Sequence, residues 1–279
     1  MIPMTIKILP PDEAAKKARE RVAEWKRQRE MDAAKTRAEA RKEKPEPERN
    51  QPSPSKTQPV VRPKRNRWAH LNPDIPEQKE KLNEELQNAA FYGSLNKVDE
   101  LLRAGADINH KRRSHGWTPL TSAIFNRAGK EMIKLLLDRG ADVNAKDGHG
   151  YTPLLTICTK KPDIPEIVEI VQLILDAGAD INAHGQGETT PLHAACSRGF
   201  YPTVKALLAA GADPNPQDEM CCTPIMAASR CAGKDIGRII QLLVESGADI
   251  NARDKDGETA LKLANFKNKE ILTRNGATK

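Results

Sequence analysis

From about residue 80 onward, short apolar stretches alternate with polar connectors that contain glycine. Gly-Ala-Asp begins at Gly105, Gly140, Gly178, Gly211 and Gly247, and each copy continues into an apolar residue or proline and then Asn. Thr-Pro keeps step with it at Thr118, Thr152, Thr190 and Thr223, and Thr259-Ala260 takes the fifth place. Two separate markers in a common register predict an array of repeated units.

Each unit predicts two helices. Proline after threonine fits the first turn of a helix, where its missing N–H costs nothing. In the third full unit an apolar stretch over 192–196 follows Thr190-Pro191, and a second stretch runs over 204–208 until Gly211, which tolerates a left-handed helix cap. Such a pair cannot bury its apolar face alone, so the units are expected to stack into a solenoid.

These residues resemble the ankyrin repeat family, most closely through Thr190-Pro191-Leu192-His193-Ala194-Ala195 and Gly211-Ala212-Asp213. The resemblance implies an all-α solenoid of helix pairs with projecting hairpins over 80–279. It divides this region into an N-terminal capping unit at 80–110, units at 116–147, 150–184, 188–217 and 221–253, and a C-terminal capping unit at 257–279. The family's His after Thr-Pro-Leu survives only as His193, and an insertion at 160–165, interpreted as a tolerated loop, interrupts the second full unit.

The resemblance also implies that partners bind a concave face lined by hairpin tips and first helices. Trp117 and Tyr151 both precede Thr-Pro, in adjacent units, and are expected to lie side by side as binding hot spots. The alternative is that they only pack against neighbouring hairpins. The complete set of candidate contact residues is Trp117, Tyr151, Phe125, Arg113, His115, Lys146, His149, His184, Arg198, Met220 and Arg230. Aromatic anchors with a basic rim predict an acidic or amphipathic peptide as the partner.

The net charge of +7 arises entirely in the first 80 residues, because the later residues carry equal numbers of acidic and basic side chains. The first 80 residues are also rich in proline and poor in apolar residues, so they cannot bury enough surface to offset chain entropy. We expect a charged, largely disordered or helical tail before the array. It comprises a short segment at 1–10, a partly formed charged helix at 11–44 and a Pro-rich basic linker at 45–79.

Two features of this tail are candidate docking elements. Trp25 would anchor the 11–44 helix on a partner, although a solvated helix explains the same composition. The basic cluster Lys64, Arg65, Arg67 and Trp68 has the character of a nuclear import signal or a phosphate-contacting patch. Short basic clusters in solvated linkers are common, and the plain linker is the favoured interpretation.

The sequence contains no P-loop, dinucleotide-binding glycine pattern, HExxH or GxSxG. The five cysteines (Cys158, Cys196, Cys221, Cys222 and Cys231) show no zinc-ligand spacing, so neither an enzyme nor a metal or cofactor site is expected. An odd cysteine count, with no secretory signal and no membrane-spanning apolar run, favours the cytoplasm. The nucleus and an injected host cell are the alternatives.

Together these features predict a monomeric, non-catalytic adaptor, scaffold or inhibitor that binds a protein partner through the concave face. The alternative is a structural subunit or translocated effector that docks through its N-terminal helix and basic linker. Nucleic acid is expected to bind only non-specifically, through the basic tail, because the array itself carries no net charge.

Overall fold

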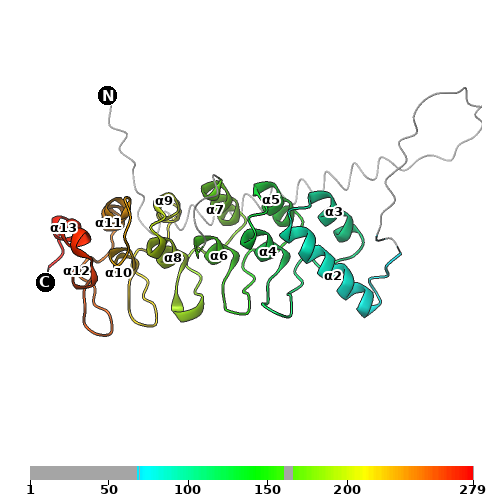
Figure 1. The fold of residues 1–279 in the computed structure, drawn as a ribbon, viewed down its shortest axis with the longest axis horizontal. Helices are drawn as coiled ribbons and strands as arrows, with labels where there is room; N and C mark the ends of the chain where they lie inside the picture. The colour runs from blue at the N-terminus through cyan, green and yellow to red at the C-terminus, as the bar shows by residue number, and fades with distance from the viewer. Residues whose placement is uncertain (1–67, 69, 160–165, 279) are drawn as a thin grey trace, which may run out of the picture.

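Helix pairs stand side by side along the length of the molecule (Figure 1). The computed structural model describes residues 68, 70–159 and 166–278. The first helices of the pairs form one row and the second helices another, and the hairpins project from the row of first helices (Figure 1). We number these hairpins one to five, beginning at Gly105, Gly140, Gly178, Gly211 and Gly247.

Apart from one isolated β-bridge between Arg253 and Thr259, the regular secondary structure of the described residues is helical, which confirms the predicted all-α solenoid. The first helices are α2 (Pro76–Phe91), α4 (Pro119–Phe125), α6 (Pro153–Thr159), α8 (Pro191–Arg198), α10 (Pro224–Ser229) and α12 (Ala260–Leu263). The second helices are α3 (Leu95–Arg103), α5 (Lys130–Asp138), α7 (Ile167–Asp176), α9 (Tyr201–Ala209), α11 (Ile236–Glu245) and α13 (Phe266–Arg274). A 3-10 helix, η1 (Gln186–Glu188), lies in hairpin three. None of the described helices combines the length and apolar character that crossing a membrane requires.

Threonine side chains cap α4, α6 and α8, whereas Thr223 and Thr259 precede α10 and α12 without a side-chain capping bond. The hydroxyl oxygen of Thr118 accepts a hydrogen bond from the backbone N–H of Thr121 at 3.2 Å, and the Thr152 hydroxyl accepts from the N–H of Leu155 at the same distance. Each such bond satisfies a backbone donor that the helix leaves open. Proline follows at the first helical position, where no N–H is needed.

Glycine closes the second helices in a left-handed conformation, with φ of 95° at Gly105. There the N–H of Ala106 donates to the carbonyl of Leu101 at 3.1 Å, so the cap satisfies a carbonyl at the end of α3. A Cβ at Gly105 would lie 2.8 Å from the Cβ of Pro73. Glycine is therefore required at this position both by the backbone and by the close approach of the preceding chain segment.

Asparagine side chains link neighbouring hairpins. The side-chain oxygen of Asn109 accepts a hydrogen bond from the N–H of Asp142 at 2.7 Å, and its amide donates to the carbonyl of Gly140 at 3.4 Å. Asn215 makes the same two bonds to Asp249 and Gly247, at 2.7 and 2.9 Å. The recurring Asn after Gly-Ala-Asp thus holds one unit to the next.

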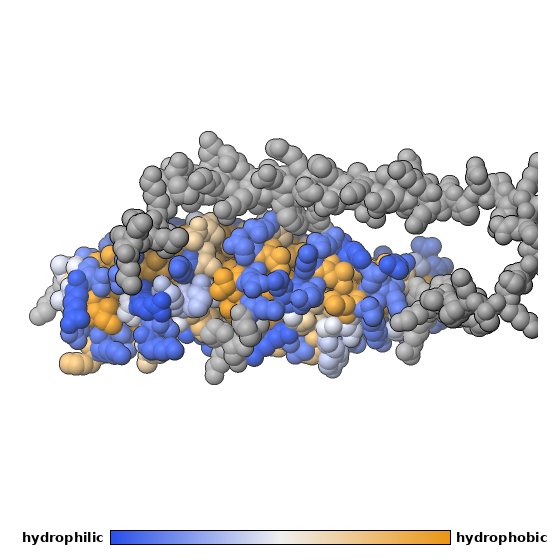
Figure 2. Space-filling view, turned by 90° about the horizontal axis from the view of Figure 1, so that it is seen from above, coloured by the Kyte–Doolittle hydropathy of each residue, from blue (hydrophilic) through white to orange (hydrophobic). Residues whose placement is uncertain are grey.

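The core lies between the two rows of helices. Seven residues before each closing glycine stands a residue that is at most 1% exposed: Val98, Ile133, Val171, Val204 and Ile240. Full burial of such a side chain stabilises the fold by roughly 1.5–3 kcal/mol. Helices this short are not stable alone in water, so packing between units sustains them. The outer surface of the second helices is mostly hydrophilic with separate hydrophobic patches (Figure 2).

The array begins earlier than the sequence predicts. The Pro-rich linker is predicted to extend to residue 79, but α2 starts at Pro76. This proline occupies the first helical position, where no backbone N–H is needed. Leu71 also packs against the core, so the segment before α2 belongs to the folded unit. The segments 1–10 and 11–44, most of the 45–79 linker and the 160–165 insertion lie outside the described residues.

Candidate functional site

Three aromatic side chains from hairpin one and α4 contact one another. The ring centroid of Trp117 lies 4.2 Å from that of Phe125 and 5.0 Å from that of His115. Trp117 is half-buried, His115 is exposed and Phe125 is 37% exposed. We call these three residues the aromatic cluster. Rigid rings that combine one packed face with one open face are well suited to contact a protein partner.

Buried Gln87 in α2 holds the backbone beneath the aromatic cluster. Its side-chain amide donates to the carbonyl of Trp117 at 2.7 Å and to the carbonyl of His110 at 2.8 Å. Its oxygen accepts from the hydroxyl of Ser122 at 2.7 Å. Three bonds from a side chain that is 1% exposed fix both ends of hairpin one against α2 and α4. The cluster is therefore pre-organised, which lowers the entropic cost of binding.

Tyr151 has a different environment from Trp117, although the two occupy equivalent positions. The Tyr151 side chain packs against the buried core, and a Cβ on Gly185 of hairpin three would lie 3.5 Å from its ring. The ring contacts described for Trp117 are instead with His115 and Phe125. The structure therefore brings Phe125 to Trp117 and directs Tyr151 toward the next unit.

Two lysines at the hairpin tips each donate a hydrogen bond to the backbone of the next hairpin. The ammonium group of Lys111 donates to the backbone carbonyl of Lys146 at 2.9 Å, and that of Lys146 donates to the carbonyl of His184 at 2.9 Å. Among the described residues neither lysine forms an ion pair with a carboxylate. Their positive charges are thus held in place at an exposed edge without being neutralised.

The other six candidate side chains are exposed along the same face, and three of them are engaged locally. Arg113 lies 3.5 Å from Glu80, His184 lies 3.1 Å from Glu188 and Arg230 lies 3.8 Å from Asp254. Met220 is 52% exposed in hairpin four. His149 and Arg198 are exposed in hairpin two and at the end of α8. These residues are spread over several units and are not gathered into one cluster.

Two aromatic residues next to this face are not among the contact residues predicted from the sequence. Phe91 and Tyr92 end α2 with their ring centroids 5.2 Å apart, and Tyr92 is 75% exposed. The amide of Asn126 donates to the carbonyl of Phe91 at 2.8 Å, which places the end of α2 beside that of α4. The first unit lacks Thr-Pro, so its residues could not be aligned with Phe125 by that marker.

The structure corrects the role expected for Trp68. Its side chain is 7% exposed and belongs to the core, and the ammonium group of Lys97 in α3 lies 5.4 Å from its ring centroid. Burying a large apolar ring stabilises the fold, whereas exposing it in a linker does not. The buried Trp68 side chain is therefore unavailable as part of an import or docking signal. Trp25, Lys64, Arg65 and Arg67 lie outside the described residues.

Two cysteines and one histidine are buried in surroundings that disfavour their charged forms. Burial raises the pKa of the Cys158 and Cys196 thiols far above their usual range, so these side chains stay protonated. Burial lowers the pKa of His193, whose ring contacts the carbonyl of Cys222 at 2.9 Å. No group of three or more potential metal ligands occurs within the part of the chain that the structure describes.

Stacked helix pairs, glycine-closed second helices and asparagine-linked hairpins define a helical solenoid of short repeats. The family model for ankyrin repeats (three copies) matches at residues 86–185, 149–218, 165–254 and 192–274, which together cover more than half of the chain. The chain therefore belongs to the ankyrin repeat family. Ankyrin repeats generally mediate protein–protein interactions, and the family is generally non-catalytic.

The curated relatives share the array but extend well beyond it. The chain is 35% identical over 170 residues to the ankyrin repeat, SAM and basic leucine zipper domain-containing protein 1 of Dasypus novemcinctus, covering 61% of this chain and 28% of that protein. It is 39% identical over 79 residues to the ankyrin repeat and SAM domain-containing protein 6 of Rattus norvegicus, covering 28% and 9%. The crystal structure of EF0377, an ankyrin repeat protein, superposes with a TM-score of 0.61 at 29% identity, covering 69% of this chain and 96% of that one.

Proposed function

We propose that this chain is a non-catalytic adaptor, scaffold or inhibitor that binds a protein partner through its hairpins and first helices. The observation that carries the proposal is the exposed aromatic cluster. Phe125 ends α4 at a position occupied by Thr159, Ser197 and Arg230 in the next three units. A large apolar side chain is thus exposed where those three units place polar ones, and it is backed by a tryptophan held in place through Gln87. Buried or half-buried aromatic anchors dominate the binding energy of many interfaces.

The charges around the aromatic cluster indicate the chemistry of the partner. Lys111 and Lys146 carry positive charges without carboxylate partners among the described residues, and Arg112 and His115 are exposed in the same hairpin as Trp117. Glu80 neutralises Arg113 in part. We infer that the partner presents an acidic or amphipathic segment. Its apolar side chains would contact the cluster and its carboxylates would face the lysines.

A paired affinity capture tests the proposal. The baits are the full chain, the Trp117→Ala/Phe125→Ala variant and a matched Val168→Ala variant. Val168 is 38% exposed on α7, close to the exposure of Phe125, but it lies on a second helix away from the hairpins. We expect a specific partner to be lost with the double variant and retained with Val168→Ala. Equal retention by all three baits would rule out the cluster as the main contact.

A truncated bait separates this proposal from the alternative of docking through the tail. Because Trp68 belongs to the core, the truncation must start just before Trp68 rather than at residue 79. A partner that follows the tail and ignores the aromatic cluster would favour a structural subunit or translocated effector. Five free cysteines, two of them deeply buried, support a reducing compartment such as the cytoplasm.

A further inference from the structure

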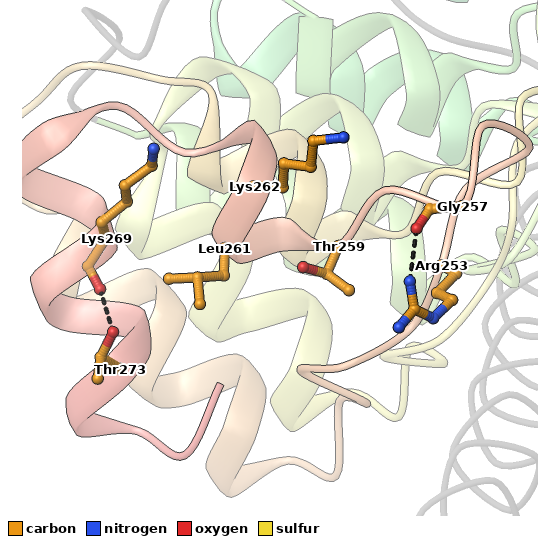
Figure 3. A pocket seen from close by; sticks show the side chains of 7 residues that line it. All are labelled: Arg253, Gly257, Thr259, Leu261, Lys262, Lys269 and Thr273. Carbon is orange, nitrogen blue, oxygen red and sulfur yellow. Dashed lines mark hydrogen bonds between the residues drawn. The ribbon is translucent and has the colours of Figure 1, made fainter. Parts of the chain in front are cut away.

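The unit formed by hairpin five, α12 and α13 presents an open groove away from the aromatic cluster. Figure 3 shows Leu261 of α12 lying between Thr259 on one side and Lys269 and Thr273 of α13 on the other. With Arg253 and Lys262 these residues line a pocket of about 420 Å³. Hairpin five, α12 and α13 therefore form a single hollowed surface.

Register along the repeats shows why this groove exists. The residue after Thr-Pro is Leu120, Leu154, Leu192 or Ile225 in the preceding units, and each is at most 1% exposed. Leu261 holds the equivalent position in α12 but remains half-buried. In each of the preceding units the first helix of the next pair packs against the helix that carries this residue. Leu261 therefore forms the apolar base of a surface whose equivalents in the other units are covered.

The rim of the groove differs in chemistry from the surfaces between units. Lys269 takes the position seven residues before the closing glycine, where Val98, Ile133, Val171, Val204 and Ile240 are buried. Thr273 takes the position of Val244 and Leu208, and Lys262 that of Met226. A further repeat with the usual apolar face would have to bury these lysines at a large cost. The groove therefore suits an occupant that brings negative charge.

The charges on the rim are incompletely neutralised. Lys262 pairs with Glu258 at 2.7 Å, which raises the pKa of that lysine. The guanidinium group of Arg253 donates only to the carbonyl of Gly257, at 2.7 Å, among the bonds described (Figure 3). Within the described residues neither Arg253 nor Lys269 forms an ion pair. Two cations thus flank Leu261 without a carboxylate partner.

We propose that this groove, lined by Arg253, Leu261 and Lys269, is a second binding surface for an acidic amphipathic segment of a partner protein. One apolar side chain of that segment would rest on Leu261, and carboxylates on either side would face Arg253 and Lys269. The surface shares no residue with the aromatic cluster. An array that binds at both places can hold two partners, or two segments of one partner.

A displayed library of random short peptides, selected on the full chain, provides the test. We expect one enriched class with Asp or Glu flanking Leu or Phe, and we expect Lys269→Glu to weaken its binding by at least about tenfold, measured by fluorescence anisotropy. Lys267→Glu is the matched control, because Lys267 is exposed on the same helix and does not line the groove. Binding to this control should change by less than about twofold, and binding to Trp117→Ala/Phe125→Ala should not change.

Several results would overturn the proposal. One is an acidic class that is lost with Trp117→Ala/Phe125→Ala, which would assign all binding to the aromatic cluster. Another is equal weakening by Lys267→Glu and Lys269→Glu, which would indicate general electrostatic attraction. A third is the absence of any class sensitive to Lys269→Glu. If sedimentation shows a dimer that Lys269→Glu dissociates, the occupant is a second copy of the chain and not an acidic partner.

Discussion

Asn144 and Asp180 are joined across two repeat units by a hydrogen bond of 2.8 Å from the backbone N–H of Asp180 to the side-chain oxygen of Asn144. The amide of the same Asn144 donates to the carbonyl of Gly178 at 3.0 Å. One side chain thus satisfies both a donor and an acceptor of the following hairpin. The array is held together at the hairpins by polar contacts as well as by its apolar core.

Replacing Asn144 by Ala should therefore lower the free energy of unfolding by about 1–3 kcal/mol, because two backbone groups lose their partner. Urea denaturation followed by circular dichroism measures the change. Gln217→Ala is the control, since Gln217 is exposed at the tip of hairpin four and should alter stability by less than about 0.5 kcal/mol. Equal stability of the two variants would contradict a structural role for the asparagine link.

Gln87→Ala should be costly for both stability and the aromatic cluster. It removes the partner of the Trp117 and His110 carbonyls and of the Ser122 hydroxyl, with an expected loss of roughly 2–4 kcal/mol. The tryptophan emission spectrum of the folded variant should also shift, because hairpin one is released. Lys81→Ala, at an exposed position of the same helix, should leave the spectrum unchanged. An unaltered Gln87→Ala spectrum would show that the cluster does not depend on this side chain.

Trp68→Ala should destabilise the array by about 3–5 kcal/mol, as expected for truncating a buried tryptophan. His70→Ala, an exposed change two residues later, serves as the comparison and should have little effect. Equilibrium unfolding of both variants in urea gives the two values. If Trp68→Ala unfolds at the same urea concentration as the unaltered chain, the placement of Trp68 in the core is wrong.

His193 should make the array less stable in acid. Burial lowers its pKa in the folded chain below the ordinary 6.5, so the unfolded chain binds the proton more readily. The contribution of neutral His193 to the free energy of unfolding is fully present above about pH 6.5. It is lost as the pH falls from there through the lower pKa of the folded chain. We expect the difference in free energy of unfolding between the unaltered chain and His193→Gln to decrease as the pH is lowered from about 7.5 to about 5. A difference that stays constant over this range would show that the folded and unfolded pKa values agree.

Local signals explain why so much of the fold could be predicted. Thr118 and Gly105 impose a helix start and a helix end through their own backbone bonds, and neither depends on distant residues. Their regular recurrence was enough to predict the stacked architecture. The start of α2 at Pro76 could not be predicted, because a proline in a Pro-rich region has the same appearance in the sequence as one that begins a helix.

The candidate site was harder to predict because it depends on contacts between units. Trp117 and Tyr151 are indistinguishable by register, yet the Tyr151 side chain packs against the core whereas the Trp117 ring contacts His115 and Phe125. Nothing in the sequence indicates that the Lys111 ammonium group reaches the carbonyl of the next hairpin. Trp68 looked like part of a basic cluster because its burial depends on α3, far along the chain. Such features follow from the relative placement of units, which periodicity does not specify.

The asparagine links have a consequence for how such arrays can change over generations. Each Asn receives a backbone amide from the following unit and needs no particular side chain there. Thr278 stands where the other units carry Asp, and its N–H still donates to the side-chain oxygen of Asn251 at 2.8 Å. A unit can thus be duplicated, exchanged or lost by recombination without a compensating substitution at this junction.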